Sequence, residues 1–232
     1  MKEIISIVSG KGGVGKSTVA SLLGLYYSKN KKVLIIDGDL GLSNISMIYN
    51  AKEIKFDVLD VMKGHCEIDE ALISINENLD VLNLCVSEKV SDYSSSLLEN
   101  IIGVLYERYD LFIIDSSAGI EQGFNNVLSI TQKMIVVLND EKTSYSDASK
   151  VVRLCKSNGV NNLFYVLNKF NKKESLKKNF FNKIFLMYGG CNIFFIRNCY
   201  GDIYRISRTI FKDREFIKLA NKLVKCSSIK LF

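Results

Sequence analysis

The sequence predicts an α/β fold in which helices cover both faces of a doubly wound, mainly parallel sheet. Apolar runs of strand length alternate with segments of helical periodicity, and this alternation is typical of such sheets. The apolar runs cover residues 3–9, 32–37, 79–84, 110–115, 133–138, 162–167 and 192–196. The helical patterns cover about 16–29, 94–107, 121–131, 143–157 and 172–187. No repeat, low-complexity tract or linker interrupts the chain, so we expect one domain over residues 1–232.

A glycine-rich loop between the first apolar run and the first helical pattern is the most specific motif. It fits G-x-x-x-x-G-K-[ST], the pattern of a loop that cradles phosphate groups. Its glycines let the backbone approach phosphate oxygens, and the N-terminus of the next helix adds a favourable dipole. Lys16 is expected to reach the β- and γ-phosphates, and the Ser17 hydroxyl to bind Mg²⁺. The loop residues expected to bind nucleotide are Gly10, Lys11, Gly12, Gly13, Val14, Gly15, Lys16, Ser17 and Thr18.

Polar residues also stand at or just after the ends of three other expected strands. They are Asp37 and Asp39, Asp115, and Asn168. Ligands of doubly wound sheets bind beyond the carboxyl ends of the strands. We therefore expect these side chains to share one pocket with the glycine-rich loop.

The motifs together resemble the MinD/ParA family of ATPases. A second lysine at the start of the loop, Lys11, marks the deviant Walker A group of P-loop NTPases. Residues 33–44 resemble the family's second strand and switch I, residues 111–115 its Walker B strand, and residues 116–124 its switch II. The resemblance is close from residue 1 to about 170 and weaker beyond. It implies ATP and Mg²⁺ as cofactors.

The resemblance also implies catalytic roles for Lys11, Lys16 and Asp39. In the family the extra lysine reaches across a dimer interface to the nucleotide of the other subunit, as an arginine finger does. Asp39 corresponds to the switch I aspartate that positions the attacking water. The implied metal site contains Ser17, with Asp37 and Asp115 acting through water. The plainer alternatives are a solvated loop lysine for Lys11 and a turn residue for Asp39.

The residues around Asn168 favour adenine over guanine. In GTP-binding proteins an N-K-x-D run reads guanine through its aspartate, whereas this chain has Asn171 at that position. Relatives use an asparagine at the position of Asn168 to contact adenine. We therefore predict ATP as the nucleotide, with Asn168 in its binding site.

Composition excludes several classes of protein. The hydrophobic content of 47% and the charged content of 24% are ordinary for a soluble globular chain. No apolar stretch is long enough to span a membrane, and the chain begins with an expected core strand, which leaves no room for a signal peptide. The 6 cysteines show no C-x-x-C spacing, which argues against a zinc site or a disulfide framework. We expect a cytoplasmic protein.

Charge is distributed unevenly along the chain. Residues 1–150 carry a net charge of −7 and residues 151–232 carry +13, within a total of +6. An asymmetry of this size indicates an anionic partner for the C-terminal third, such as a lipid surface, nucleic acid or an acidic protein. The alternative is a solvated basic surface that compensates the acidic nucleotide-binding half.

The C-terminal helix, expected at about 214–225, has two interpretations. Its apolar face and basic flanks suit a helix that lies on a membrane surface. The same face suits a final helix that docks on the sheet, and we favour docking. A short tail, residues 226–232, follows and is too short to hold a membrane alone.

The subgroup resembled most is the MinD/FlhG type, which includes FleN and YlxH. We expect an ATP-dependent homodimer that hydrolyses ATP slowly and regulates the position or number of a cell structure, a flagellum or the division site. Its expected partners are an FlhF-like or MinE-like regulatory protein and, through peripheral contact, the inner face of the cell membrane. One alternative is a ParA-like segregation ATPase that binds DNA through its basic C-terminal third. Another is a nucleotide-bound interaction protein with negligible turnover.

Overall fold

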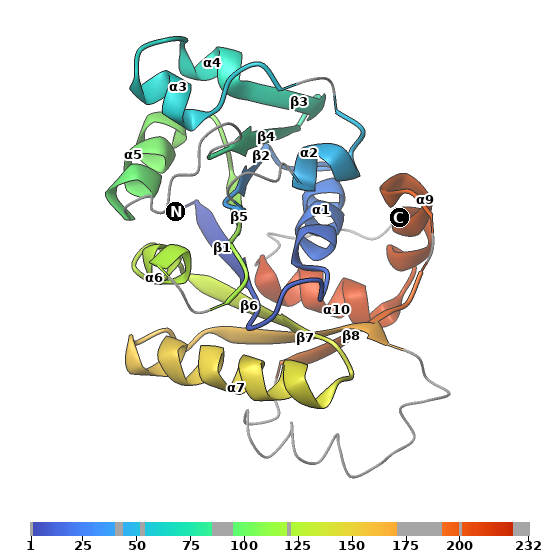
Figure 1. The fold of residues 1–232 in the computed structure, drawn as a ribbon. Helices are drawn as coiled ribbons and strands as arrows, with labels where there is room; N and C mark the ends of the chain where they lie inside the picture. Colours follow the sequence, from blue (N-terminus) through green and yellow to red (C-terminus); the bar gives the residue numbers. More distant parts are fainter. Residues whose placement is uncertain are drawn as a thin grey trace.

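The computed structural model describes residues 2–39, 44–51, 54–84, 95–119, 122–170, 192–199 and 201–224. Over these residues the chain has the predicted doubly wound fold, a mostly parallel sheet between two layers of helices (Figure 1). The strands are β1 (Glu3–Val8), β2 (Val33–Asp37), β3 (Leu72–Asn76), β4 (Leu79–Asn83), β5 (Leu111–Asp115), β6 (Lys133–Leu138), β7 (Leu163–Phe170) and β8 (Ile193–Arg197). The helices are α1 (Lys16–Tyr27), α2 (Asn44–Ile48), α3 (Val58–Met62), α4 (Ile68–Ala71), α5 (Ser95–Leu105), α6 (Gln122–Leu128), α7 (Lys142–Ser157), α9 (Ile203–Ile210) and α10 (Arg214–Leu223).

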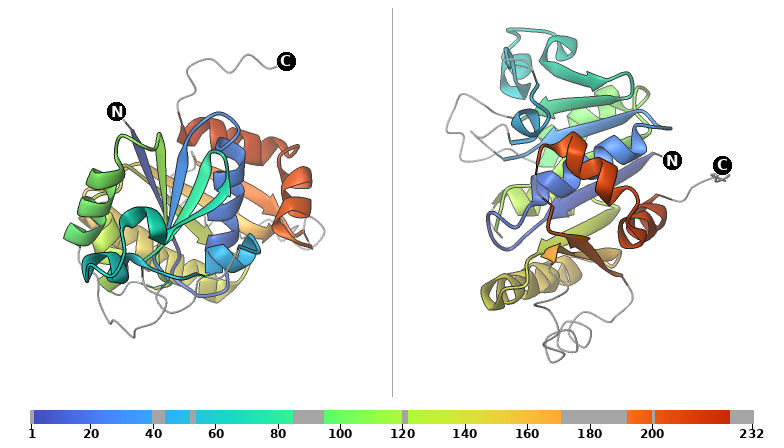
Figure 2. Two further views of the ribbon diagram at one scale, coloured as in Figure 1. Left: turned by 90° about the horizontal axis from the view of Figure 1, so that it is seen from above. Right: turned by 90° about the vertical axis from the view of Figure 1, so that its right-hand side faces the viewer.

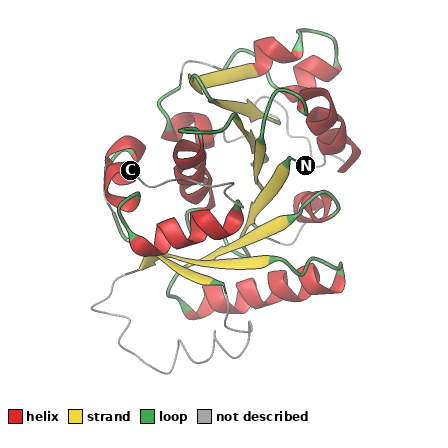
Figure 3. Cartoon of the chain, turned by 180° about the vertical axis from the view of Figure 1, so that it is seen from behind, coloured by secondary structure: helices red, strands yellow, loops and turns green. Residues whose placement is uncertain are grey.

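The order of the strands places β1 in the interior of the sheet. The described strands run β3-β4-β2-β5-β1-β6-β7-β8, and each pairs in parallel with its neighbour except β3, which is antiparallel to β4. The sheet is twisted along this order (Figure 3). Because the strands from β4 to β8 are parallel, their carboxyl ends meet at one edge of the sheet.

Each helix layer has its own apolar core against one face of the sheet. In β2, Leu34 and Ile36 belong to the core beneath α5, α6 and α7, whereas Val33 and Ile35 belong to the core beneath α1, α9 and α10. The two layers lie on opposite sides of the sheet (Figure 2). Strands buried on both faces need apolar residues at every position, which explains the continuous runs in the sequence.

Strand β3 and several short helices were not predicted. In β3, polar Ser74 and Asn76 are exposed and Leu72, Ile73 and Ile75 are only half buried, so polar residues interrupt the apolar run. Helices α2, α3 and α4 have only 4 or 5 residues each, too few for a clear helical period. Helix α9 was also missed. The helix expected at 172–187 and the tail at 226–232 lie outside the described residues.

The C-terminal helix α10 docks on the domain. Its apolar side chains Phe216, Leu219 and Leu223 are buried in the core shared with α1. The Tyr27 hydroxyl donates to the Ala220 carbonyl at 2.6 Å. The docking interpretation is therefore confirmed for 214–223, and this apolar face is not available to a lipid surface. Among the described helices, none is both long and apolar enough to cross a bilayer.

Truncating the buried face of α10 is expected to destabilise the whole domain. Leu219→Ala should lower the free energy of unfolding by about 2–5 kcal/mol, because it removes a fully buried side chain and leaves a cavity. The control is Asn221→Ala on the exposed face of the same helix, expected to change stability by less than about 0.5 kcal/mol. Urea unfolding measures both. Equal effects of the two substitutions would show that α10 is not docked.

Candidate functional site

The loop between β1 and α1 presents unpaired amide groups at the N-terminus of α1. Gly15 precedes the helix in a left-handed conformation, with φ 95° and ψ 33°, and no side chain caps the helix. A helix that begins without a capping side chain leaves its first N–H groups free to bind an anion. Lys16, at the first position of the helix, is only 6% exposed. The predicted phosphate-binding loop therefore has both unpaired donors and a buried cation.

Two of the loop glycines are required by close packing. A Cβ atom on Gly10 would lie 2.4 Å from the backbone carbon of Asp147, in α7. A Cβ atom on Gly15 would lie 2.2 Å from Nδ2 of Asn168, and its φ of +95° independently favours glycine. The loop is thus confined by α7 on one side and by the end of β7 on the other.

Two carboxylates are buried side by side near the loop. Asp37 and Asp115 are paired residues at the ends of β2 and β5. Burial and the charge of Asp115 together raise the pKa of Asp37 to about 7, although hydrogen bonds from the N–H groups of Ile45 and Asp39 act in the opposite direction. Burial likewise raises the pKa of Asp115 to about 6, although the Lys16 charge and the Ser17 hydroxyl lower it. Two carboxyl groups that are hard to ionise together form a site for a cation.

The chemistry of these groups fits Mg²⁺. Both oxygens of the Asp115 carboxylate are buried, and the Lys16 charge and the Ser17 hydroxyl are the groups beside it that favour its ionised form. Mg²⁺ commonly binds in proteins through one or two carboxylates, with water and substrate phosphates completing its shell. Within the described chain no cluster of three His, Cys, Asp or Glu side chains forms a complete protein cage. The assignment of Ser17, Asp37 and Asp115 as the residues that would hold the ion stays a prediction.

A cleft of about 520 Å³ opens over the loop, which is large enough for a nucleotide. Its walls contain Lys16 and Ser17 together with Asp39. Oδ2 of Asp39 accepts a hydrogen bond of 2.7 Å from Nδ2 of Asn44, which also lines the cleft. Sequence reasoning did not assign Asn44 a role, although it lies in the run that resembles switch I. Residues 40–43 and 120–121, which belong to the two expected switches, lie outside the described residues.

Asn168 lies against the phosphate loop. Its side chain is buried, and Nδ2 donates a hydrogen bond of 2.9 Å to the Val14 carbonyl. The structure therefore brings Asn168 into contact with the phosphate loop, although Asn168 does not line the cleft itself. Its contact with adenine stays a prediction.

Lys11 points out of the cleft that its own loop forms. Its Nζ donates to Oε2 of Glu141 at 2.8 Å and to the Thr143 hydroxyl at 3.5 Å. Both Lys11 and Glu141 are about half exposed, and the Lys11 charge lowers the pKa of Glu141. Lys11 does not line the cleft, whereas Lys16 does. The two loop lysines therefore occupy different positions, and only Lys16 faces the phosphate site of its own subunit.

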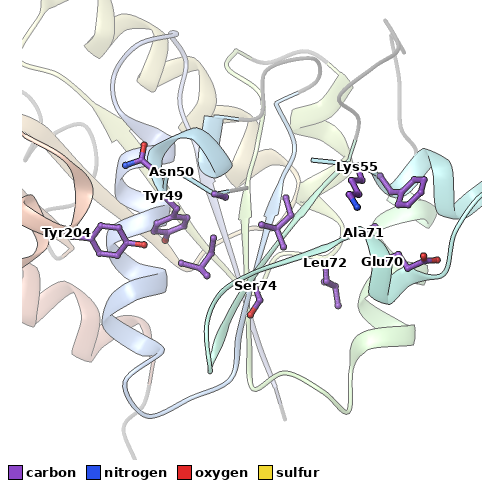
Figure 4. A pocket seen from close by; sticks show the side chains of 12 residues that line it. Tyr49, Asn50, Lys55, Glu70, Ala71, Leu72, Ser74 and Tyr204 are labelled. Atoms are coloured by element: carbon purple, nitrogen blue, oxygen red, sulfur yellow. The ribbon is translucent and has the colours of Figure 1, made fainter. Parts of the chain in front are cut away.

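A second cavity of about 500 Å³ lies apart from the nucleotide cleft. It runs along β3, between Tyr49 and Tyr204 on one side and Lys55 and Glu70 on the other (Figure 4). None of the residues predicted to bind nucleotide lines it. Of the predicted site residues, Lys16, Ser17, Thr18 and Asp39 line the cleft at the phosphate loop together with Gly12, Gly13 and Gly15.

Replacing Asp115 by asparagine is expected to stabilise the nucleotide-free protein at neutral pH. The folded-state pKa of about 6 lies above the ordinary aspartate pKa of 3.8, so the aspartate favours folding below pH 4 and loses this contribution as pH rises through 6. Asp115→Asn should therefore gain stability relative to the native chain as pH rises through this range, reaching about 3 kcal/mol above pH 6 because each unit of pKa shift corresponds to about 1.4 kcal/mol. Urea midpoints at several pH values measure it. A difference independent of pH would contradict the raised pKa that burial gives Asp115.

Comparison with known proteins agrees with the geometry. A family model for an AAA domain matches residues 2–166. The septum site-determining protein MinD of Synechocystis sp. is 32% identical over 173 residues, which cover 73% of this chain. The aligned region spans 65% of that relative, just under two thirds of its length.

Solved structures share the fold over nearly the whole chain. A chain of the MinC:MinD cell division protein complex of Aquifex aeolicus has a TM-score of 0.80 and 29% identity, and the match covers 99% of this chain and 98% of that one. MinD of Pyrococcus horikoshii, solved with Mg-ADP, has a TM-score of 0.79 and 25% identity, with 97% of each chain covered. The chain belongs to the MinD/ParA family of deviant Walker A P-loop ATPases, whose nucleotide is ATP and whose metal is Mg²⁺.

Proposed function

We propose that this chain is a slow ATPase that acts as an ATP-dependent dimerisation switch and regulates the site of cell division. The position of Lys11 is the observation that carries the proposal. Its Nζ is bound to Glu141 and Thr143, outside the cleft where Lys16 serves the phosphates of the same subunit. In this position Lys11 can contact a triphosphate only after it leaves Glu141 and Thr143 at the start of α7. The triphosphate that it then contacts is the one bound to a second subunit that faces the cleft.

An exposed apolar side chain beside the cleft supports a face-to-face dimer. Met47, in α2, lines the nucleotide cleft and is 64% exposed. A single exposed apolar side chain is common on protein surfaces, so Met47 adds to the argument from Lys11 and does not carry the dimer alone. A second copy of the chain across the cleft would bury Met47 together with the nucleotide.

Hydrolysis in this site depends on positioning and charge. The loop N–H groups and Lys16 bind the phosphates, and Asp39, oriented by Asn44, positions the attacking water. Bound Mg²⁺ supplies charge that neutralises the phosphate oxygens. Lys11 from the second subunit adds a cation where negative charge develops in the transition state. Loss of the γ-phosphate then removes the contact that holds the subunits together.

The division site is the favoured target because the relatives are septum site-determining or cell division proteins. The Aquifex complex contains MinC, so a regulatory protein is the class of partner that we propose. We place flagellar positioning second.

The exposed basic side chains of α9 and α10 support peripheral contact with an anionic surface. They are Arg205, Arg208, Lys212, Arg214, Lys218 and Lys222. We propose the inner face of the membrane as that surface, with DNA as the alternative. DNA binding through the same residues would weaken steeply with added salt, because bound counterions are released.

The switch predicts a trapped dimer when hydrolysis is blocked. Asp39→Ala should form dimers with Mg-ATP and remain monomeric with Mg-ADP, because the γ-phosphate is retained only in the first case. Light scattering after size exclusion measures the mass. Monomers with both nucleotides would remove the dimerisation switch, even if nucleotide binding is retained.

Weakening the hold on Lys11 is expected to favour the dimer. Glu141→Gln keeps the shape of the side chain but removes its charge, so Lys11 leaves α7 more easily. An exposed ion pair contributes about 0.2–1 kcal/mol, so the ATP concentration at half-maximal dimerisation should fall by up to about fivefold. Glu107→Gln, at the other end of the strands, is the control and should change nothing. A higher ATP requirement for Glu141→Gln would mean that Glu141 assists the dimer.

A further inference from the structure

Lys169 has a backbone conformation that is uncommon for a residue with a side chain. Its φ is +55°, and in the described part of the chain only Asn50 shares this property among non-glycine residues. It lies near the end of β7, where the pairing with β8 shifts register between Leu167 and Phe170. Such a conformation is unfavourable and persists where surrounding contacts hold it. The contacts of the Lys169 side chain therefore indicate why the left-handed backbone conformation is present.

Asn168 and Lys169 hold two consecutive carbonyls of the phosphate loop. Nζ of Lys169 donates to the Gly13 carbonyl at 2.9 Å, and Nδ2 of Asn168 donates to the Val14 carbonyl at 2.9 Å. Successive side chains on a regular strand point to opposite faces, so they could not reach neighbouring carbonyls. The left-handed turn at Lys169 brings its side chain to the same loop as that of Asn168.

These contacts fix the direction of the loop amide groups. In a trans peptide the C=O and the following N–H point in opposite directions. Holding the carbonyls of Gly13 and Val14 towards the end of β7 thus turns the N–H groups of Val14 and Gly15 the other way. Those N–H groups belong to the loop that binds phosphate, and Lys169 itself lines the cleft.

We propose that Lys169 is a positioning residue, which holds the phosphate loop in its anion-binding shape before nucleotide arrives. The role needs only one subunit, so it does not rest on the dimerisation switch. Without Lys169 the Gly13 carbonyl can turn into the cleft and oppose the phosphates. Nucleotide affinity then falls, while the chemical step is spared because Lys169 acts through the loop.

The test compares Lys169→Gly with the native chain by calorimetric titration of Mg-ADP. Glycine accepts a φ of +55° without strain, so the substitution removes the side chain and leaves the backbone free to keep its course. The urea midpoint should stay at or above that of the native chain. The Kd for Mg-ADP should rise about three- to tenfold, as expected for one hydrogen bond of ordinary strength from an exposed side chain. In turnover, KM should rise and kcat should stay within about twofold.

Two further variants complete the design. Lys169→Arg keeps a charged donor and should recover most of the affinity for Mg-ADP. Lys156→Ala removes an exposed lysine at the far end of α7 and should leave the Kd unchanged. A folded Lys169→Gly that binds Mg-ADP within about twofold of the native chain would overturn the proposal. A loss of affinity accompanied by a lower urea midpoint would also overturn it, because it would show a role in the stability of the fold.

Discussion

The fixed position of β1 within the sheet is the constraint on which the nucleotide site depends. β1 pairs with both β5 and β6, and Ile5 and Ile7 are fully buried. The loop that follows therefore starts from a rigid point. Neighbouring elements confine the loop further, since the Gly119 N–H donates to the Ser9 carbonyl and α7 packs against Gly10. A loop held in this way can keep its amide groups unpaired without collapsing onto itself.

The site is assembled at a local cost in stability. Asp37 and Asp115 are buried next to each other, and burial makes both carboxyl groups hard to ionise. Their raised pKa values mean that ionisation at neutral pH opposes folding of the nucleotide-free protein. Binding of a cation would reverse this effect, and the groups that weaken the empty protein are those predicted to bind Mg²⁺. Local conflicts of this kind are expected at functional sites. The surrounding apolar cores, which extend on both faces of the sheet, hold the arrangement in place.

The sequence predicts those features that depend on local patterns. The strand at 33–37 and the start of α1 at Lys16 were placed correctly, because apolar runs and the loop motif fix them. The shared location of Asp37, Asp39 and Asp115 was predicted because the carboxyl ends of parallel strands meet at one edge of the sheet. The hydrogen-bond partners of Lys11 and Lys169 could not be predicted from the sequence. Lys11 and Glu141 are 130 residues apart, and Lys169 and Gly13 are 156 residues apart. No periodicity links such positions, and only the packing of β7 and α7 beside the loop brings them together.

The central claim is that catalysis requires two subunits, with Lys11 of one acting on the nucleotide of the other. The most direct test is the rate of ATP hydrolysis per subunit, measured across a wide range of protein concentrations at saturating ATP. A reaction that depends on a second subunit has a rate per subunit that rises with concentration and then reaches a plateau. We predict this rise for the native chain. A rate per subunit that stays constant from the most dilute sample upwards would show that each subunit hydrolyses ATP alone, and it would contradict the account.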